Sequence, residues 1–433
     1  MDTIHSDEPL ADEILRRIPA ARYTDPAFAE REAAGLWPRV WQFACTVDCV
    51  PNPGDWWEYR LGKMSAIVVR GQDGVLRAFQ NACTHRASPL LDGAGCGLTA
   101  ITCPFHSWTF DLAGRRGGSG KYDLKPLRLG VWAGMVFVDW RQEGESLEEF
   151  LGVVPGELAW VGLEQFTCRH VITIPIACNW KLVMDAFNEV YHVHAVHPQL
   201  LPAADDVNVP IRLLDRHSYF EQTFGISSPR LKHDDGAQAD NAMWRAFIEN
   251  VGHRIGGKLA VTTDPATPPP MPAIPEGQTL KDVLARLVGD HLRTLSPIYA
   301  ELDPRHVLND FHYYVFPNLI FNTFAGWCGI NRARPGATPD TCYFDLWSFD
   351  LLPPGDADTH VRPAASTIAP EEAAAFGRVM MQDVELLPRL QRGMSQPGVA
   401  VLNLTPSEIR IGHMHQTLDR YLETSVAREL GEE

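Results

Sequence analysis

The sequence lacks the features that mark membrane, secreted and nucleic-acid-binding proteins. No stretch reaches about 18 consecutive apolar residues, so we expect no transmembrane helix. The N-terminal stretch, Met1 to Glu8, is acidic and has neither the basic nor the apolar region of a signal peptide. The formal net charge of −16 is the opposite of the basic face that a phosphate backbone requires. The nine cysteines show no disulfide spacing pattern, which favours a reducing, cytoplasmic location.

What the chain does contain is two short pairs of metal-ligating residues, Cys83-x-His85 and Cys103-x-x-His106. Each pair offers one thiolate and one imidazole in a turn-like stretch, and residues 86–102 separate the pairs. Two thiolates with two imidazoles can close a tetrahedral zinc site, or they can hold a [2Fe–2S] cluster with Cys on one iron and His on the other. Zinc fingers usually pair Cys with Cys and His with His. The mixed pairs therefore favour the cluster, with zinc as the alternative.

A second group of candidate ligands lies in the helical stretch 179–198. Glu189 and His192 are three residues apart and would share one face of a helix. His197 follows five residues later, which would rotate it away from that face in a regular helix. The proline after His197 disfavours α geometry, so a distortion could bring His192 and His197 onto one metal. The alternative pairing, His192 with His194, would suit a strand.

Two histidines need a carboxylate to complete the facial triad of non-haem Fe(II) oxygenases, which leaves adjacent coordination positions open for O₂. This carboxylate must come from elsewhere in the chain. The candidates are Asp310, Asp345, Asp350, Asp383 and Glu385. Of these, Asp345 and Asp350 lie in a predicted strand and are expected to face solvent.

Around both groups, the sequence resembles the large, catalytic alpha subunits of the Rieske non-haem iron ring-hydroxylating oxygenases. The segment Cys103–Asp111 resembles their CPxHxWxFD motif, with Ser107 where Gly is usual. The stretch after Asn179-Trp-Lys resembles their (D/E)-x-x-H-x-x-x-x-H motif. Ser88 and Phe105 stand where respiratory Rieske proteins carry an additional disulfide. Further resemblances extend over almost the whole chain, at Ile18–Tyr23, Leu36–Trp41, Phe316–Asn318 and Pro406–Ile409.

This resemblance implies a role for each group. A [2Fe–2S] Rieske cluster is expected on Cys83, His85, Cys103 and His106. A mononuclear Fe(II) is expected on His192, His197 and Asp383, the last of these in a late helix similar to the family's third-ligand helix. Glu189 is expected to link the two sites across a subunit boundary, by accepting hydrogen bonds from a cluster His of one subunit and an iron His of the next.

The implied fold class is α+β, with an all-β Rieske domain and a helix-grip, START-like catalytic domain with an antiparallel sheet. The expected divisions are an N-terminal helical segment packing on the catalytic domain (1–37), the Rieske domain (38–156) and the catalytic domain (157–433). The implied protein is an oxygenase component that takes electrons from NAD(P)H through a separate reductase, a ferredoxin, or both. It would use O₂ to hydroxylate a hydrophobic, aromatic or polycyclic substrate by mono- or dioxygenation. The alternative is a monooxygenase or demethylase of a quaternary amine. The implied assembly is a homotrimer, or α3β3 with a small β subunit.

Several further expectations concern the pocket and the surface. The candidate pocket residues are Phe187, His312, Phe316, Phe321 and Trp327, of which His312 would orient a polar substrate group. The proline-rich segment 264–277 would either cover the entrance or form a neutral insertion. Six basic residues near the cluster either dock an acidic electron-transfer partner or form an ordinary solvated face: Arg86, Arg115, Arg116, Lys121, Lys125 and Arg128. The predicted helices cover 9–36, 179–192, 279–302, 369–392 and 415–430. The main predicted strands cover 65–70, 75–79, 131–138, 311–324 and 341–351.

Overall fold

The computed structural model describes residues 16–231, 236–250 and 270–429 of the 433-residue chain. Residues 42–139 form a small β module built on a seven-stranded sheet with the strand order β2-β10-β9-β5-β4-β3-β6. The strands are β2 (Gln42–Thr46), β3 (Trp56–Leu61), β4 (Met64–Arg70), β5 (Leu76–Gln80), β6 (Ala94–Gly95), β9 (Pro126–Trp132) and β10 (Met135–Asp139). A separate two-stranded ribbon, β7 (Ile101–Thr102) and β8 (Thr109–Phe110), has the second Cys/His pair between its strands.

The rest of the chain is organised around an eight-stranded sheet with the order β12-β13-β14-β15-β16-β17-β11-β18. Every neighbouring pair is antiparallel except β11 and β18. The strands are β11 (Thr167–Ile176), β12 (Ile211–Leu214), β13 (His217–Gln222), β14 (Asp310–Val315), β15 (Leu319–Phe324), β16 (Trp327–Pro335), β17 (Cys342–Asp350) and β18 (Ala364–Thr367). Near the chain ends, β1 (Arg17–Pro19) pairs with β19 (Val401–Asn403).

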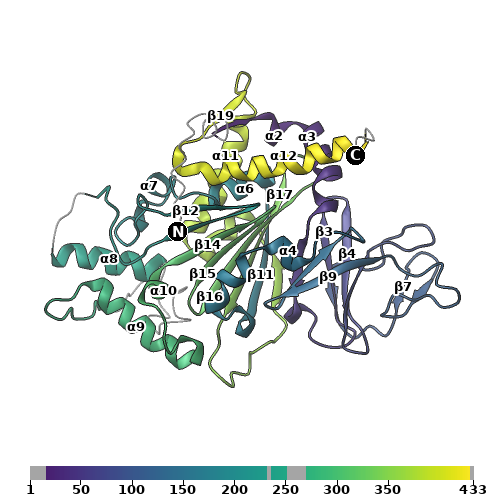
Figure 1. Cartoon of the computed structure of the whole chain (residues 1–433), viewed down its shortest axis with the longest axis horizontal. Coiled ribbons are helices and arrows are strands. Elements are labelled where there is room, and N and C mark those ends of the chain that lie inside the picture. The colour runs from purple at the N-terminus through teal and green to yellow at the C-terminus, as the bar shows by residue number, and fades with distance from the viewer. Residues whose placement is uncertain (1–15, 232–235, 251–269, 430–433) are drawn as a thin grey trace.

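The helices gather mainly around this larger sheet. They are α2 (Ala21–Thr24), α3 (Pro26–Gly35), α4 (Leu147–Leu151), α5 (Val154–Glu157), α6 (Trp180–Phe187), α7 (Val193–Val196), α8 (Ala237–Asn250), α9 (Leu280–Leu295), α10 (Pro304–Leu308), α11 (Arg378–Met394) and α12 (Ile409–Glu429). Figure 1 shows α12 running beside α11 and α6 over one end of the sheet, with the β module to one side. No helix among the described residues combines the length and the apolar character that crossing a bilayer requires.

The two faces of the eight-stranded sheet cover different parts of the molecule. The face we call the module face packs against the β module, where Trp347 contacts Phe43 at 4.9 Å between ring centroids and Phe321 contacts Trp132 at 5.8 Å. The opposite face, which we call the helix face, packs against α6, because α6 contacts β15, β16 and β17. Side chains alternate between faces along a strand, so each residue can be assigned to one of them.

Several predicted elements differ from the structure for identifiable reasons. Of the helix predicted over 9–36, residues 9–15 lie outside the described residues. The described remainder is β1 followed by α2 and α3, and Pro26 begins α3 with Asp25 as its N-cap. The single strand predicted over 131–138 is a hairpin, because Ala133 and Gly134 adopt positive φ and reverse the chain between β9 and β10. The strand predicted over 311–324 is likewise two strands, β14 and β15.

Other corrections concern the catalytic part of the chain. The helix predicted over 179–192 ends at Phe187, and the helix predicted from 415 already begins at Ile409. Gly377, at a φ of 99°, interrupts the helix predicted over 369–392 and separates a 3₁₀ segment from α11. Part of the proline-rich segment 264–277 lies outside the described residues, and 270–277 contains no helix or strand. Asp345, expected to face solvent, is 1% exposed because Arg332 and Arg334 pair with it at 2.8 and 2.6 Å.

Candidate functional site

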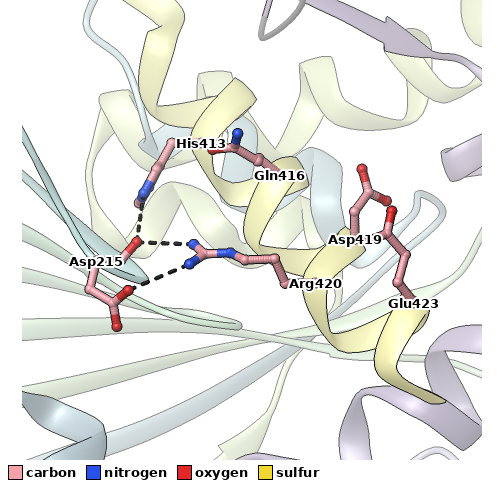
Figure 2. Close-up of a pocket in the computed structure, with 6 residues that line it drawn as sticks. All are labelled: Asp215, His413, Gln416, Asp419, Arg420 and Glu423. Atoms are coloured by element: carbon pink, nitrogen blue, oxygen red, sulfur yellow. Dashed lines mark hydrogen bonds and ion pairs between the residues drawn. The ribbon is translucent and has the colours of Figure 1, made fainter. Parts of the chain in front are cut away.

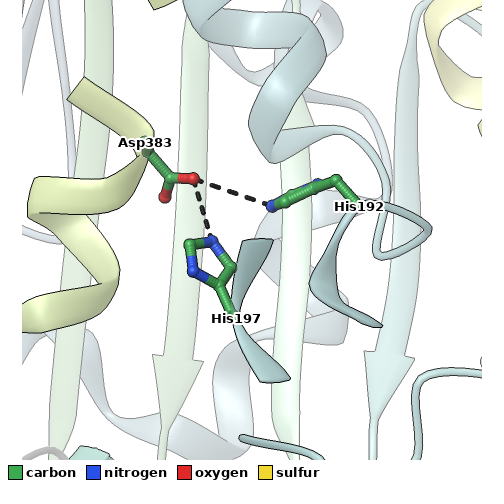
Figure 3. Close-up of side chains that lie close together, drawn as sticks. All are labelled: His192, His197 and Asp383. Atoms are coloured by element: carbon green, nitrogen blue, oxygen red, sulfur yellow. Dashed lines mark hydrogen bonds and ion pairs between the residues drawn. The ribbon is translucent and has the colours of Figure 1, made fainter. Parts of the chain in front are cut away.

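His192, His197 and Asp383 come together in space although α11 is far from the two histidines in sequence. His197 Nε2 lies 2.9 Å and His192 Nε2 lies 3.7 Å from Asp383 Oδ1. One ligand atom from each residue lies within 4.8 Å of the other two. Figure 3 shows both imidazole edges directed at the carboxylate. His197 and Asp383 are 2% and 4% exposed, so the group is largely shielded from solvent.

The backbone around His192 explains how two histidines five residues apart can face one point. α6 ends at Phe187, where Asn188 N–H donates to Asp185 O at 3.0 Å and closes a tight last turn. The short helix α7 then runs from Val193 to Val196, and His197 leaves it at φ −120° and ψ 50°. A regular helix would have turned His197 away from His192. The distortion expected before Pro198 is therefore present, and it brings the two rings to 5.1 Å between centroids.

Each imidazole is oriented by a hydrogen bond at Nδ1. Glu189 Oε1 lies 2.5 Å from His192 Nδ1, while Glu189 Oε2 accepts from the backbone N–H of His192 at 2.9 Å. Gln382 Oε1 lies 2.9 Å from His197 Nδ1, and Gln199 Nε2 also donates to this oxygen at 2.6 Å. A proton on each Nδ1 leaves each Nε2 as a lone-pair donor aimed at Asp383.

This donor set fits a divalent transition metal. Two neutral imidazole nitrogens and one carboxylate oxygen form the facial arrangement that non-haem Fe(II) uses. The partners at both Nδ1 atoms supply the outer hydrogen bonds that ligating histidines usually have. Gln382 and Gln199 were not found from the sequence. The position of Gln382 directly before Asp383 was the only available signal.

The competing ligand candidates have other partners or positions. His194 Nδ1 lies 2.5 Å from Tyr191 O, outside the triad. Asp310 Oδ1 accepts the backbone N–H of Thr323 at 3.0 Å, and Asp345 is held by two arginines. Glu385 is exposed on α11, and Asp350 is a partly buried residue at the end of β17. Among the described residues, the only group of three or more metal-ligating side chains found together is His192, His197 and Asp383.

The two Cys/His loops of the β module have the same backbone pattern. Cys83 N–H donates to Ser88 O at 2.9 Å, and Ala87 N–H donates to Cys83 O at 2.8 Å. The second loop repeats these bonds, from Cys103 N–H to Trp108 O at 2.8 Å and from Ser107 N–H to Cys103 O at 3.0 Å. Ala87 and Ser107 occupy matching positions at φ of 56° and 57°, a region that glycine prefers. Ser107 therefore adopts the conformation that the family's usual glycine would adopt.

The four side chains of these loops are arranged asymmetrically. Cys83 and Cys103 are buried, at 3% and 2% exposed, whereas His85 and His106 are exposed with ring centroids 4.7 Å apart. Buried thiols beside paired surface imidazoles fit a [2Fe–2S] cluster with an inner Cys₂ iron and an outer His₂ iron. Trp108 stacks on His85 at 4.6 Å and shields one side of the site.

The surface around these histidines is aromatic and basic. Arg86 lies over the Phe105 ring at 4.4 Å, and Arg116 lies over Trp108 at 3.7 Å. Phe105 is 57% exposed, which is unusual for a large apolar side chain. Five of the six basic residues near the loops are exposed: Arg86, Arg115, Arg116, Lys121 and Lys125. The sixth, Arg128, is partly buried in an ion pair with Asp139.

Hydrogen bonds join α6, the helix that precedes His192 and His197 in the chain, to segments near both ends of the described chain. Tyr23 O–H donates to Asp185 Oδ2 at 2.6 Å, and its oxygen lies 2.8 Å from His415 Nε2. Burial raises the pKa of Asp185 to about 7, although this bond and Lys181 act in the opposite direction. Lys181 Nζ pairs with Glu32 at 2.7 Å, and both side chains are buried. These contacts fix α6 against α2, α3 and α12.

The five predicted pocket residues do not lie together. Phe187 packs on Phe344 of β17 at 5.5 Å between ring centroids, and the Trp327 ring lies over Gly329. His312 also faces this side of the sheet. Phe321 lies on the module face, and Phe316 stacks on Tyr421 of α12 at 5.2 Å. Phe321 and Phe316 therefore pack against the β module and α12, respectively, and the expectation that they line a pocket stays a prediction.

A separate polar pocket of about 500 Å³ lies along α12 (Figure 2). It is lined by Asp215, His413, Gln416, Asp419, Arg420 and Glu423. Its lining includes none of the triad or cluster-loop residues. We therefore do not assign it to the site.

Comparisons with known proteins assign a family profile to each of the two parts of the chain. The family profile described as "Ring hydroxylating alpha subunit (catalytic domain)" matches residues 160–424, and the profile "Rieske [2Fe-2S] domain" matches residues 40–121. The oxygenase subunit of carnitine monooxygenase from Escherichia coli is 32% identical over 244 residues, covering 51% of this chain and 63% of the relative. The oxygenase subunit of glycine betaine monooxygenase from Pseudomonas aeruginosa is 29% identical over 206 residues, covering 45% of this chain and 48% of the relative. The chain thus spans about half to three-fifths of the length of these relatives.

Two solved structures share the fold. A quaternary ammonium Rieske monooxygenase in complex with L-carnitine superposes with a TM-score of 0.65 at 16% identity, covering 97% of this chain and 99% of the other. A mutant form of naphthalene 1,2-dioxygenase bound to phenanthrene superposes with a TM-score of 0.64 at 16% identity, covering 95% and 94%. The expected α+β fold, a Rieske domain with a ring-hydroxylase catalytic domain, is confirmed.

Proposed function

The chain belongs to the family of ring-hydroxylating oxygenase alpha subunits with a Rieske [2Fe–2S] domain, and from this premise we propose that it is the oxygenase component of an O₂-dependent monooxygenase for a quaternary amine. Family membership implies a [2Fe–2S] cluster and a mononuclear iron. We assign the cluster to Cys83, His85, Cys103 and His106. We assign the iron to His192, His197 and Asp383. We place the domain divisions after residues 37 and 156.

The observation that carries this proposal is the geometry of the triad. Two Nε2 atoms and one carboxylate oxygen lie within 4.8 Å of one another, and both rings are oriented from behind by Glu189 and Gln382. Bound iron would supply the O₂ chemistry. The reaction consumes O₂, two electrons and two protons, placing one oxygen atom in the substrate and releasing the other as water. The residues of this chain hold the imidazoles in one tautomer and exclude bulk water.

The supply of electrons requires partners. We propose that electrons from NAD(P)H reach the cluster through a separate reductase, with or without a ferredoxin. The exposed imidazoles of His85 and His106 and the basic residues around them suit an acidic electron-transfer protein. The net charge of the whole chain is −16, so this basic surface is a local exception.

We further propose that Glu189 passes electrons between neighbouring copies in a homotrimer, with or without a small β subunit. Among the described residues, Glu189 hydrogen-bonds to His192 alone. The ring contacts of His85 and His106 all lie within the β module. Within the described part of one chain, no contact joins His85 or His106 to Glu189. A cluster histidine of one copy that contacts Glu189 of the next copy would join the two centres.

The preference for a quaternary amine reverses the order expected from the sequence, in which an aromatic substrate came first. The carnitine and glycine betaine monooxygenase subunits support this choice. A feature of this chain supports it as well. The helix face of the sheet carries the side chains of Asn322 and Ser348 and the Nε2 atom of His312, which a purely hydrophobic substrate would leave unpaired.

The test starts from the purified protein reconstituted with iron and sulfide. We expect a red-brown visible spectrum and three irons per chain, two in the cluster and one mononuclear. With a surrogate reductase and NADH, oxygen uptake should rise on addition of glycine betaine or carnitine, and not on addition of naphthalene. Full metal content with oxygen uptake stimulated only by naphthalene would overturn the substrate class. A colourless protein holding zinc would overturn the whole proposal.

A further inference from the structure

The helix face of the large sheet carries a row of polar side chains in its central strands. The antiparallel register places His312 opposite Asn322, Asn322 opposite Gly329, and Gly329 opposite Ser348. Residues that are directly opposite share a face, with Cβ atoms roughly 5 Å apart. Phe344, four residues before Ser348 on β17, contacts Phe187 of α6, so this row lies on the side of the sheet that α6 covers.

The amides in this part of the sheet are not satisfied by the protein. Within the described parts of the chain, the side chains of Asn322 and Asn331 make no hydrogen bond to another residue. Asn322 and Ser348 remain partly exposed although β15 and β17 are interior strands. Unpaired amides in the interior of a sheet are costly unless water or a ligand pairs with them. The row is therefore open to a partner.

Beneath one end of the row lies a fully buried cation, Arg410 of α12, which is 0% exposed. Its guanidinium donates to Ser218 Oγ at 2.9 Å and to His312 Nδ1 at 3.2 Å, and it lies 4.6 Å from the Phe220 ring. Among the described residues, no carboxylate forms an ion pair with it. Burial lowers the pKa of Arg410 to about 9, so the group remains charged at neutral pH.

The contact with Arg410 fixes the protonation of His312. A guanidinium only donates, so His312 Nδ1 must accept and the single ring proton resides on Nε2. Burial, together with the charge of Arg410, lowers the pKa of His312 well below its ordinary value, so the ring stays neutral. The ring also stacks on Phe220 at 4.0 Å, which holds its plane. His312 Nε2–H is thus a fixed donor beside Asn322.

We propose that His312 Nε2–H and the amide of Asn322 form a subsite for a carboxylate group of the substrate, with Arg410 as the positioning residue that sets the His312 tautomer. The Asp310 carboxylate interacts with Arg410 from beyond ion-pair distance. The charge of Arg410 therefore still adds a positive potential at this end of the row, which favours an anionic acceptor. This inference rests on the proposed function and narrows it. The substrate is a zwitterion that carries a quaternary ammonium and a carboxylate.

The experiment uses two ligands of similar size that differ in the carboxylate. Glycine betaine carries it, and ethyltrimethylammonium has a methyl group in its place. Binding is measured by isothermal titration calorimetry with oxygen excluded, on protein holding both metals, so no turnover is needed. The wild type should bind glycine betaine at least about tenfold more tightly than ethyltrimethylammonium, as expected for hydrogen bonds to a charged group.

The variants separate a binding role from a structural one. His312→Leu should weaken glycine betaine about 10- to 100-fold and change ethyltrimethylammonium by less than about threefold. His312→Gln retains an N–H donor near the same position and should recover most of the loss. Asn322→Leu should show the same selective loss. Arg410→Met keeps the length of the side chain without its charge and should lower the preference for glycine betaine. If the Arg410→Met variant does not fold, the comparison of His312→Leu with His312→Gln decides the test.

Each remaining outcome overturns one proposal. If the wild type binds both ligands equally, or binds neither, the carboxylate subsite is wrong. An equal loss of both ligands in His312→Leu, or no loss at all, also overturns it. If glycine betaine binds selectively but neither glycine betaine nor carnitine stimulates oxygen uptake with reductase present, the subsite stands and the proposed reaction is wrong.

Discussion

Gln382 provides a direct test of how the iron ligands are held. Its Oε1 accepts from His197 Nδ1–H at 2.9 Å and from Gln199 Nε2 at 2.6 Å, so one oxygen fixes the His197 ring. Gln382→Leu removes this acceptor and leaves the Nδ1–H of a 2% exposed histidine unpaired. A buried donor left without a partner costs about 1–3 kcal/mol. Part of this cost should appear as weaker metal binding, because the ring can then rotate away from Asp383.

The expected result is a 10- to 100-fold weaker affinity for mononuclear iron, the range typical for the loss of an outer partner of a ligating histidine. Iron affinity is measured by competition with a chromogenic chelator under nitrogen, with the visible spectrum of the cluster as an internal control. Glu385→Gln, an exposed position on the same helix, is the matched control and should leave iron affinity unchanged. If Gln382→Leu retains wild-type iron affinity within about threefold, the orientation argument is refuted.

Four further outcomes follow from the same geometry. Cys83→Ser should abolish the visible cluster spectrum, and a retained spectrum would contradict the ligand assignment. Asp383→Ala should leave that spectrum intact while mononuclear iron and turnover are lost, and full iron content would direct the search for the third ligand to Asp310. Glu189→Gln should retain both metals yet reoxidise a chemically reduced cluster much more slowly under O₂ with substrate bound, whereas wild-type kinetics would reduce Glu189 to a structural role. For Asp185, burial raises the folded-state pKa from 3.8 to about 7. This carboxyl therefore binds its proton more tightly in the folded state than in the unfolded state. Its contribution to the free energy of unfolding falls as the pH rises from about 4 to 7. Asp185→Asn should remove that fall in urea unfolding measured across this pH range, and identical pH profiles would show that Asp185 titrates normally.

The cluster loops illustrate what sequence can predict well. Both pairs lie within a few residues, and the spacing alone selects a small set of metal sites. The structure adds why the spacing works: each loop closes with the same two backbone bonds around its cysteine. The departure at Ser107 also becomes intelligible. Its φ of 57° is accessible to serine at a cost of about 1 kcal/mol, so glycine is favoured there but not required.

The second site shows where local rules fail. The periodicity of residues 179–192 predicts one helix, but α6 ends at Phe187. Helix propensity is a weak preference, and tertiary contacts override it here. Asp185 accepts a hydrogen bond from the Tyr23 hydroxyl, and Glu189 accepts one from the backbone N–H of His192. The helix must end before His192 for His192 and His197 to face one point. The helix prediction is therefore wrong at the candidate metal site.

The assignment of residues to the helix face of the sheet was hidden from the sequence for a different reason. Alternation along a strand predicts that residues share a face but not which face meets α6. Phe321 and His312 therefore looked equally suitable as pocket residues. The packing of Trp132 on Phe321 assigns the Phe321 ring to the module face. The hydrogen bond from Arg410 shows which ring nitrogen of His312 carries the proton.

Long-range hydrogen bonds account for the residues that sequence reasoning missed. Glu189 acts on a histidine three residues away, so a motif can contain both. Gln382 acts on a histidine 185 positions earlier, and Arg410 acts on a histidine 98 positions earlier. Neither contact leaves a local pattern, because any helix surface can carry a Gln or an Arg. In both cases a side chain without catalytic chemistry of its own determines which imidazole nitrogen carries the proton. The reactivity expected at this site thus depends on tautomers set by α11 and α12, while the histidines themselves come from the α6–α7 segment and from β14.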